Sequence, residues 1–180
     1  MHLRFSLGIL AAMNELDEAW SQMLAGAVEN ARASGRPDVA DYLNLKLTND
    51  AIRQTSVGWL FDSLIEIASD GNRQNPSITI EREEPHEFPF RGAKMAGSLL
   101  RVRLGVRCLT LEAGWTRTPS HGFMRGGALA AARIIHFGMP KSGAELILVR
   151  NDDTPAWNSV EGEQFDSESL RRHFTIFLGN

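Results

Sequence analysis

The chain has 180 residues, of which 43 % are hydrophobic, and its formal net charge at pH 7 is −3. This length suits one compact domain, and the hydrophobic content with so low a net charge excludes an intrinsically disordered protein. Its one cysteine, Cys108, cannot form an intramolecular disulfide, which fits a reducing compartment. We therefore expect residues 13–180 to form a single domain.

The N-terminal segment, residues 1–12, has the form of a weak signal peptide. Arg4 is followed by a short apolar run that ends at Met13. The run is far shorter than the roughly 20 apolar residues that a membrane span needs. Met13 also precedes a good helix start, so an over-extended start codon explains the segment equally well. We predict a cytoplasmic protein without a membrane partner, with export left open by this start.

The first half of the chain predicts helices. The first runs from Asn14 as its N-cap to a stop at Gly35 and Pro37. Its apolar stripe consists of Leu16, Trp20, Met23, Leu24, Ala27, Val28 and Ala31. A second segment after Asp38 suits a helix, although the alternation of Leu43, Leu45 and Leu47 leaves a short strand open. A third, from Asn49 to Ser69, is apolar on most sides, so we expect it to be buried against a sheet or a second copy of itself.

The middle of the chain predicts strands. Ile78 and Ile80 alternate with polar residues, and residues 84–90, with two prolines, form an extended edge or a loop. Alternation from Leu100 to Cys108 predicts one strand whose opposite face carries Arg101, Arg103 and Arg107. Since Leu109 and Leu111 fall on the arginine face, we expect a bulge, a bend or a stretch buried on both sides there.

The second half predicts a loop, further strands and a last helix. Residues 114–127 form the loop, and residues 128–137 suit a strand better than a helix because a turn over 138–143 leads into the apolar run 146–149. Asp166 caps the last helix, with Phe165 and Leu170 packed across the cap and Gly179 after its end. The predicted fold class is α+β, with N-terminal helices, a strand-rich antiparallel sheet in the middle and second half, and one C-terminal helix.

Charge is distributed unevenly along the chain. Residues 91–150 carry ten basic and two acidic side chains, whereas residues 1–90 carry seven basic and fourteen acidic ones. The row formed by Arg101, Arg103 and Arg107 could bind an acidic protein or nucleic acid, because guanidinium groups match carboxylates and phosphates. Glu81 and Glu83 lie on the neighbouring predicted strand and could pair with two of these arginines. We favour internal neutralisation over a nucleic-acid surface.

The loop of residues 114–127 carries the other candidate site. It interleaves Trp115, Arg117, His121, Phe123 and Arg125 with glycine, threonine and proline. Aromatic and arginine side chains together suit the stacking of a base or another ring, and His121 is the best candidate for acid–base chemistry. We favour a simpler interpretation, in which Trp115 and Phe123 anchor the loop to the core.

We expect no cofactor and no metal. Glu83, Glu84, His86 and Glu87 lie close together in the sequence, but ligands from one local segment rarely fix a metal's geometry, so we interpret them as a solvated acidic segment. Nucleotide-binding, metalloprotease and nucleophile-elbow motifs are absent.

These observations favour a non-enzymatic binding domain. The leading hypothesis is a homo-oligomer, most simply a homodimer, that acts through protein contacts and could bind an acidic partner. The first alternative is nucleic-acid or phospholigand binding through residues 91–150, using Arg101, Arg103, Arg107, Arg117 and Arg125, with Trp115 or Phe123 stacking. The second alternative is a small enzyme centred on His121.

Overall fold

The computed structural model describes residues 7–74, 77–151 and 154–179, and over these residues the fold is α+β. The described part of the chain contains three α-helices and a seven-stranded antiparallel sheet, with helices at both ends of the chain, as the sequence predicts. The helices are α1 (Leu7–Ala33), α2 (Pro37–Gln74) and α3 (Ser167–Leu178). The strands are β1 (Thr79–Phe90), β2 (Ala93–Leu104), β3 (Arg107–Trp115), β4 (Ala130–His136), β5 (Ala144–Asn151), β6 (Thr154–Ser159) and β7 (Gln164–Phe165).

The first helix is longer than predicted. It begins at Leu7, so the assignment of Asn14 as its N-cap is wrong, and the predicted N-terminal segment lies partly in this helix and partly outside the described residues. The leucine, isoleucine, alanine and methionine residues that precede Asn14 explain the extension. Their helix propensities are high, and a single asparagine within a helix lowers its stability by less than about 1 kcal/mol. The predicted end is confirmed, since α1 ends at Ala33 and Gly35 has a φ of 68°.

The second and third predicted helices are one helix, α2. The short strand considered at Leu43–Leu47 is wrong, and no break occurs at Asn49. Thr48 explains the continuity, because its hydroxyl donates to the Asn44 carbonyl one turn earlier and so does not act as a cap. Gly71 does not end the helix either. A side chain there would stand 2.7 Å from the Phe174 ring, so the glycine admits close packing of α3.

The chain divides into two compact units, residues 1–51 and residues 52–180. In the first unit the helices form a hairpin whose buried apolar side chains are Leu24, Val28, Ala31 and Ala40 among the described residues. The second unit contains the sheet, α3 and the later part of α2. The expectation that residues 13–180 form one domain stays a prediction.

The sheet is a meander in which each strand pairs with the next in chain order. Its edge strand β1 includes residues 84–90, which confirms the predicted extended edge, and β4 confirms the predicted strand over 128–137. The single strand predicted over Leu100–Cys108 is wrong, because β2 and β3 form a hairpin in which Leu104 pairs with Arg107. Gly105 in this turn has a φ of 58°, and Val106 is 89 % exposed.

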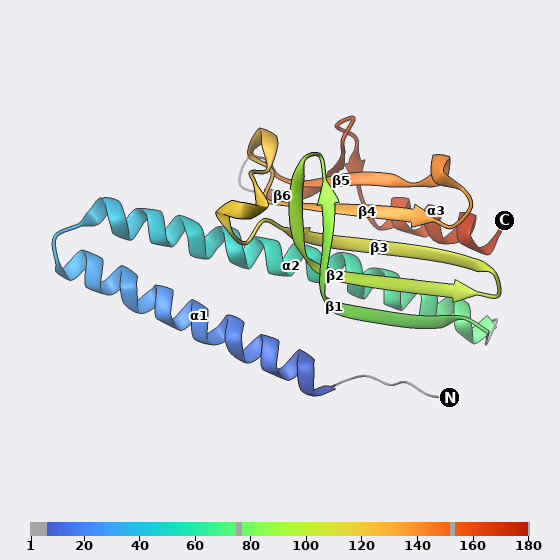
Figure 1. Cartoon of the computed structure of the whole chain (residues 1–180), viewed down its shortest axis with the longest axis horizontal. Coiled ribbons are helices and arrows are strands. Elements are labelled where there is room, and N and C mark those ends of the chain that lie inside the picture. The colour runs from blue at the N-terminus through green and yellow to red at the C-terminus, as the bar shows by residue number, and fades with distance from the viewer. Residues whose placement is uncertain (1–6, 75–76, 152–153, 180) are drawn as a thin grey trace. The chain divides into compact units, whose positions relative to one another are not determined.

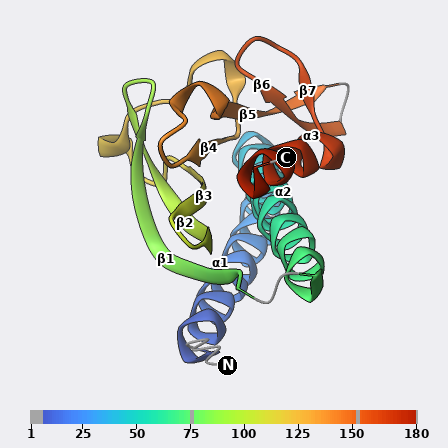
Figure 2. The same ribbon diagram turned by 90° about the vertical axis from the view of Figure 1, so that its right-hand side faces the viewer.

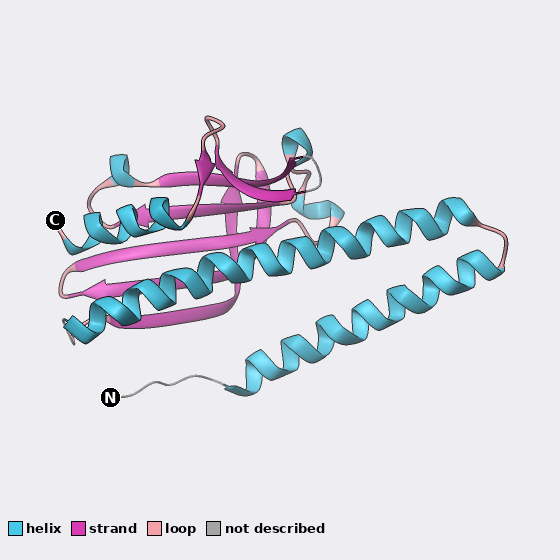
Figure 3. Ribbon diagram, turned by 180° about the vertical axis from the view of Figure 1, so that it is seen from behind, coloured by secondary structure: helices cyan, strands magenta, loops and turns pink. Residues whose placement is uncertain are grey.

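One face of the sheet covers α3 and the later part of α2 (Figures 2 and 3). Leu60, Phe61 and Leu64 of α2 are fully buried there against strand residues such as Leu100 and Leu111. This confirms that the apolar segment 57–67 is buried against a sheet. Trp59 is an exception, with 38 % of its surface exposed.

The far half of the β1–β2 hairpin is turned across the other face of the sheet (Figure 1). The bend coincides with a register shift between Glu83 and His86, and there Gly97 of β2 pairs with Gly114 of β3. A side chain on Gly97 would stand 2.0 Å from the Ala113 carbonyl oxygen, so the close approach of the strands requires glycine. Beyond the bend, a second apolar cluster forms from Phe88, Phe90, Ala93, Met95 and Ala131.

The C-terminal helix α3 follows its predicted signals. Asp166 Oδ1 accepts a hydrogen bond of 2.8 Å from the Ser169 backbone N–H, and Gly179 ends the helix with a φ of 85°. Phe165 and Leu170, the residues predicted to pack across the cap, are both buried.

Candidate functional site

The predicted arginine row is largely neutralised within the protein. Arg101 Nη1 lies 3.0 Å from Glu83 Oε2, and Arg103 Nε lies 3.7 Å from Glu81 Oε2, which confirms the expected cross-strand pairing. Arg107 does not belong to the row, because the hairpin at Gly105 places it on the opposite face. There its guanidinium donates to the Leu178 carbonyl at the end of α3, where a cation complements the helix dipole.

The loop of residues 116–129 connects β3 to β4 through two short 3-10 turns. Trp115 packs against the main core, and the Arg117 guanidinium covers its ring at 4.5 Å from the centroid. Phe123 is 84 % exposed, so the expectation that it anchors the loop is wrong. Arg125 has no carboxylate partner among the described residues, and neither has Arg117. The loop therefore carries one exposed aromatic ring and two guanidinium groups without a carboxylate partner among the described residues.

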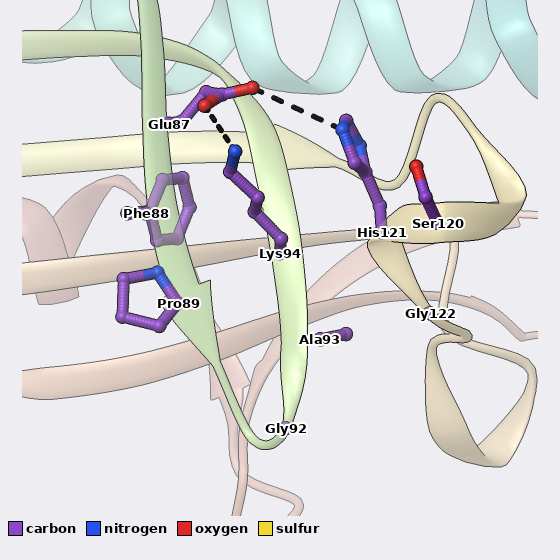
Figure 4. Close-up of a pocket in the computed structure, with 9 residues that line it drawn as sticks. All are labelled: Glu87, Phe88, Pro89, Gly92, Ala93, Lys94, Ser120, His121 and Gly122. Carbon is purple, nitrogen blue, oxygen red and sulfur yellow. Dashed lines mark ion pairs between the residues drawn. The ribbon is translucent and has the colours of Figure 1, made fainter.

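A pocket of about 550 Å³ lies between this loop and the β1–β2 hairpin (Figure 4). Its charged groups are Glu87 and Lys94 from the hairpin and His121 from the loop. Lys94 Nζ lies 2.5 Å from Glu87 Oε2, and His121 Nε2 lies 4.0 Å from Glu87 Oε1. The hydrogen bond from Lys94 lowers the pKa of Glu87, which is therefore ionised at neutral pH.

The two ring nitrogens of His121 are both directed at groups of the protein. The Arg117 backbone N–H donates to Nδ1 over 3.3 Å, which places the proton of a neutral ring on Nε2, facing Glu87. A general base needs a nitrogen lone pair directed at the substrate. This arrangement does not favour a catalytic role for His121, and it suits a side chain that ties the loop to the hairpin.

Sequence analysis missed a buried charged network at the bend of the sheet, formed by Glu112, Arg133 and His86. The Glu112 side chain is 9 % exposed; its Oε2 accepts from Arg133 Nε and Nη2 at 2.9 and 2.5 Å, and its Oε1 lies 2.8 Å from His86 Nε2. The Arg133 guanidinium also covers the Phe88 ring at 5.3 Å. Both oxygens of Glu112 have a partner, so this network ties strands β1, β3 and β4 together at the bend.

The helical hairpin of the first unit exposes large apolar side chains. Trp20 and Met23 lie three residues apart on one side of α1 and are 43 % and 57 % exposed. Tyr42 and Leu45 are spaced likewise on α2 and are 66 % and 53 % exposed. Lys46 of α2, one turn after Tyr42, reaches over the Trp20 ring at 5.1 Å from its centroid. We call Trp20, Met23, Tyr42 and Leu45 the hairpin patch.

Comparison of the chain with known protein families, with curated proteins and with solved structures found no match. No helix in the described part of the chain is both long enough and apolar enough to cross a membrane. The described residues contain no group of three or more histidine, cysteine, aspartate or glutamate side chains that could hold a metal ion.

Proposed function

We propose that the protein is a binding domain that self-associates through its helical hairpin. The observation that carries the proposal is the hairpin patch, in which four large apolar side chains are each at least 43 % exposed. The hairpin itself buries only four apolar side chains among its described residues, and only one of them, Leu24, is larger than valine. Two packed helices bury only the side chains that lie between them. The hairpin patch lies outside that contact, so a further pair of helices is needed to bury it.

A second copy of the chain is the partner that this surface fits. Two hairpins packed side to side make a four-helix bundle, and a two-fold axis gives each patch an identical patch to cover. The four side chains expose on the order of 400 Å² per copy, about half of the 800 Å² that each partner contributes to a typical stable interface. Flanking positions on the two long helices can supply the rest. The apolar residues of α2 between Val57 and Ile67 are covered by the chain's own sheet, so they are not available for this contact.

The test is the mass in solution of the full chain and of a double variant, Met23→Glu with Leu45→Glu. Both side chains are more than half exposed within one copy, so their replacement leaves the monomer folded. Light scattering at about 50 μM is expected to give twice the 19.9 kDa chain mass for the wild type and the chain mass for the double variant. Phe123→Glu, at a more exposed apolar position in the second unit, is the control and stays dimeric. A monomeric wild type would refute the proposal.

Nucleic-acid or phospholigand binding is a second candidate function, favoured by the loop around Phe123. Arg117 and Arg125 have no carboxylate partner among the described residues, whereas Arg101 and Arg103 have one each. Fluorescence anisotropy with labelled DNA and RNA, repeated over a salt series, gives the slope of log affinity against log salt concentration. This slope falls by roughly one unit for each phosphate contact removed. Arg117→Ala with Arg125→Ala is expected to flatten the slope, and Arg101→Ala with Arg103→Ala is the control. The absence of binding at low salt removes this candidate.

A cytoplasmic location remains part of the proposal. Its support is the lone Cys108, which is half-buried and forms no disulfide.

A further inference from the structure

Two histidines face each other beneath α3. His136 is the last residue of β4 and is 2 % exposed, and His173 lies in the middle of α3. His136 Nε2 lies 3.0 Å from His173 Nδ1, and the two rings are stacked with their centroids 5.3 Å apart. This hydrogen bond joins the helix to the sheet, and the same helix buries Leu170, Phe174 and Phe177 in the main core.

The contacts of the pair fix which nitrogens carry protons. His173 makes a backbone hydrogen bond with Ser142 that raises its pKa, as an accepting carbonyl does, so its Nε2 carries the proton. Its Nδ1 then accepts the proton that His136 holds on Nε2. The other nitrogen of His136, Nδ1, is left as a buried lone pair without a hydrogen-bond partner. Both rings are therefore neutral in the packed structure.

Neither ring can gain a proton without loss of packing or hydrogen bonding. A proton on His173 Nδ1 would face the N–H of His136 and break the hydrogen bond between the rings. A proton on His136 Nδ1 would place a cation and an unpaired donor in the core. The cation that acts on His173 is Arg172 of α3, and among the described residues no carboxylate forms an ion pair with either ring. The Phe165 ring lies against His173, with the two ring centroids 6.0 Å apart, and Leu109 of β3 is the cross-strand partner of His136.

We propose that the His136–His173 pair makes the docking of α3 on the sheet acid-sensitive, so that proton uptake releases α3 while the rest of the sheet stays folded. Release exposes the apolar face of α3, including Phe174 and Phe177, and the core positions that they cover. Burial lowers the pKa of both histidines, and that of His173 falls to about 4 because of burial, His136 and Arg172. The sensitive range therefore lies between pH 6.5 and about 4.

The size of the effect follows from proton linkage. A ring with a pKa of 6.5 when released and about 4 when docked binds protons preferentially in the released state at pH 5. This preference multiplies the opening equilibrium of α3 by roughly tenfold to thirtyfold between pH 7.5 and pH 5, the lower figure allowing for partial solvent exposure of His173.

Hydrogen–deuterium exchange of the full chain tests the proposal. Protection of α3 amides, corrected for the pH dependence of intrinsic exchange, is expected to fall roughly tenfold to thirtyfold from pH 7.5 to pH 5, with the β1–β2 hairpin little changed. His173→Gln removes one titrating ring, keeps a donor for Ser142 and should reduce the fall to about threefold or less. His136→Gln is the second variant, and His121→Gln is the control that keeps the wild-type response.

Two results would overturn the proposal. One is a wild-type protein in which α3 loses no more protection than the β1–β2 hairpin, a measurement that does not depend on any variant folding. The other is a folded His173→Gln protein that keeps the full wild-type change.

Discussion

Replacing Gly97 by alanine tests whether close approach of backbones holds the bend of the sheet. A Cβ at this position would stand 2.0 Å from the Ala113 carbonyl oxygen and 2.6 Å from the Gly114 Cα. Backbone atoms cannot rotate away as side chains do, so β2 and β3 must separate by about 1 Å to restore ordinary contact. We therefore expect Gly97→Ala to destabilise the second unit strongly.

The expected loss is about 3 kcal/mol. Separation of the strands weakens the backbone hydrogen bonds around the pairs Ala96–Trp115 and Ser98–Ala113, and two weakened bonds with buried, unsatisfied groups cost about 3 to 5 kcal/mol. The lower entropy of the unfolded alanine chain offsets about 0.4–1 kcal/mol of this. Since whole domains are stable by only about 5–15 kcal/mol, the change is large enough to measure directly.

Urea unfolding at pH 7.5 and fixed protein concentration, followed by circular dichroism and tryptophan fluorescence, measures the free energy of unfolding. Gly58→Ala is the matched control, because this helical glycine has nothing within 4 Å of its would-be Cβ. It is expected to stabilise the protein by about 0.8–1 kcal/mol through helix propensity. If Gly97→Ala lies within 1 kcal/mol of the wild type, the glycine contact does not hold the bend.

Three further substitutions test the rest of the structure by the same unfolding measurement. Arg133→Met leaves the buried Glu112 carboxylate with His86 alone and should cost about 3 kcal/mol, whereas Arg103→Met at an exposed pair should cost about 0.5 kcal/mol or less. Leu64→Ala should cost about 2–5 kcal/mol because the side chain is fully buried, in contrast to Val106→Ala at an 89 % exposed position. The Ser169 N–H lowers the pKa of Asp166 below 3.8, so the capping carboxylate stabilises α3 above that pH. Asp166→Ala should therefore lower the urea midpoint at pH 7, and its difference from the wild type should vanish on acidification; a difference that persists at pH 2 would contradict this.

The hairpin between β2 and β3 shows how a local pattern can mislead. Apolar residues alternate without a break from Leu100 to Cys108, so a single strand satisfies the pattern as well as a hairpin does. The apolar residues occupy even-numbered positions up to Cys108 and odd-numbered positions at Leu109 and Leu111. This shift in the alternation is the sequence signal of the turn. A two-residue turn pairs Leu104 with Arg107 and so reverses which positions face the core.

The candidate sites were predictable to different degrees. The pairing of Arg101 and Arg103 with glutamates followed from the alternation of two neighbouring strands. Glu112 and Arg133 lie 21 positions apart and meet only because β3 and β4 pair in one particular register. His136 and His173 lie 37 positions apart, on a strand and a helix, and no spacing in the sequence relates them.

The sequence by itself determined the α+β class, the antiparallel strands, and the end and cap of α3. These features depend on residues within a turn or two of one another, such as Asp166 with Ser169 or the glycine after a helix. Tertiary structure decided how closely α3 packs on α2, which group Arg107 binds and how the β1–β2 hairpin bends. Each of these depends on a contact with a distant segment: Gly71 with Phe174, Arg107 with Leu178, and Gly97 with Ala113. Local propensities differ by less than about 1 kcal/mol per residue, so burial and steric contact between distant segments override them.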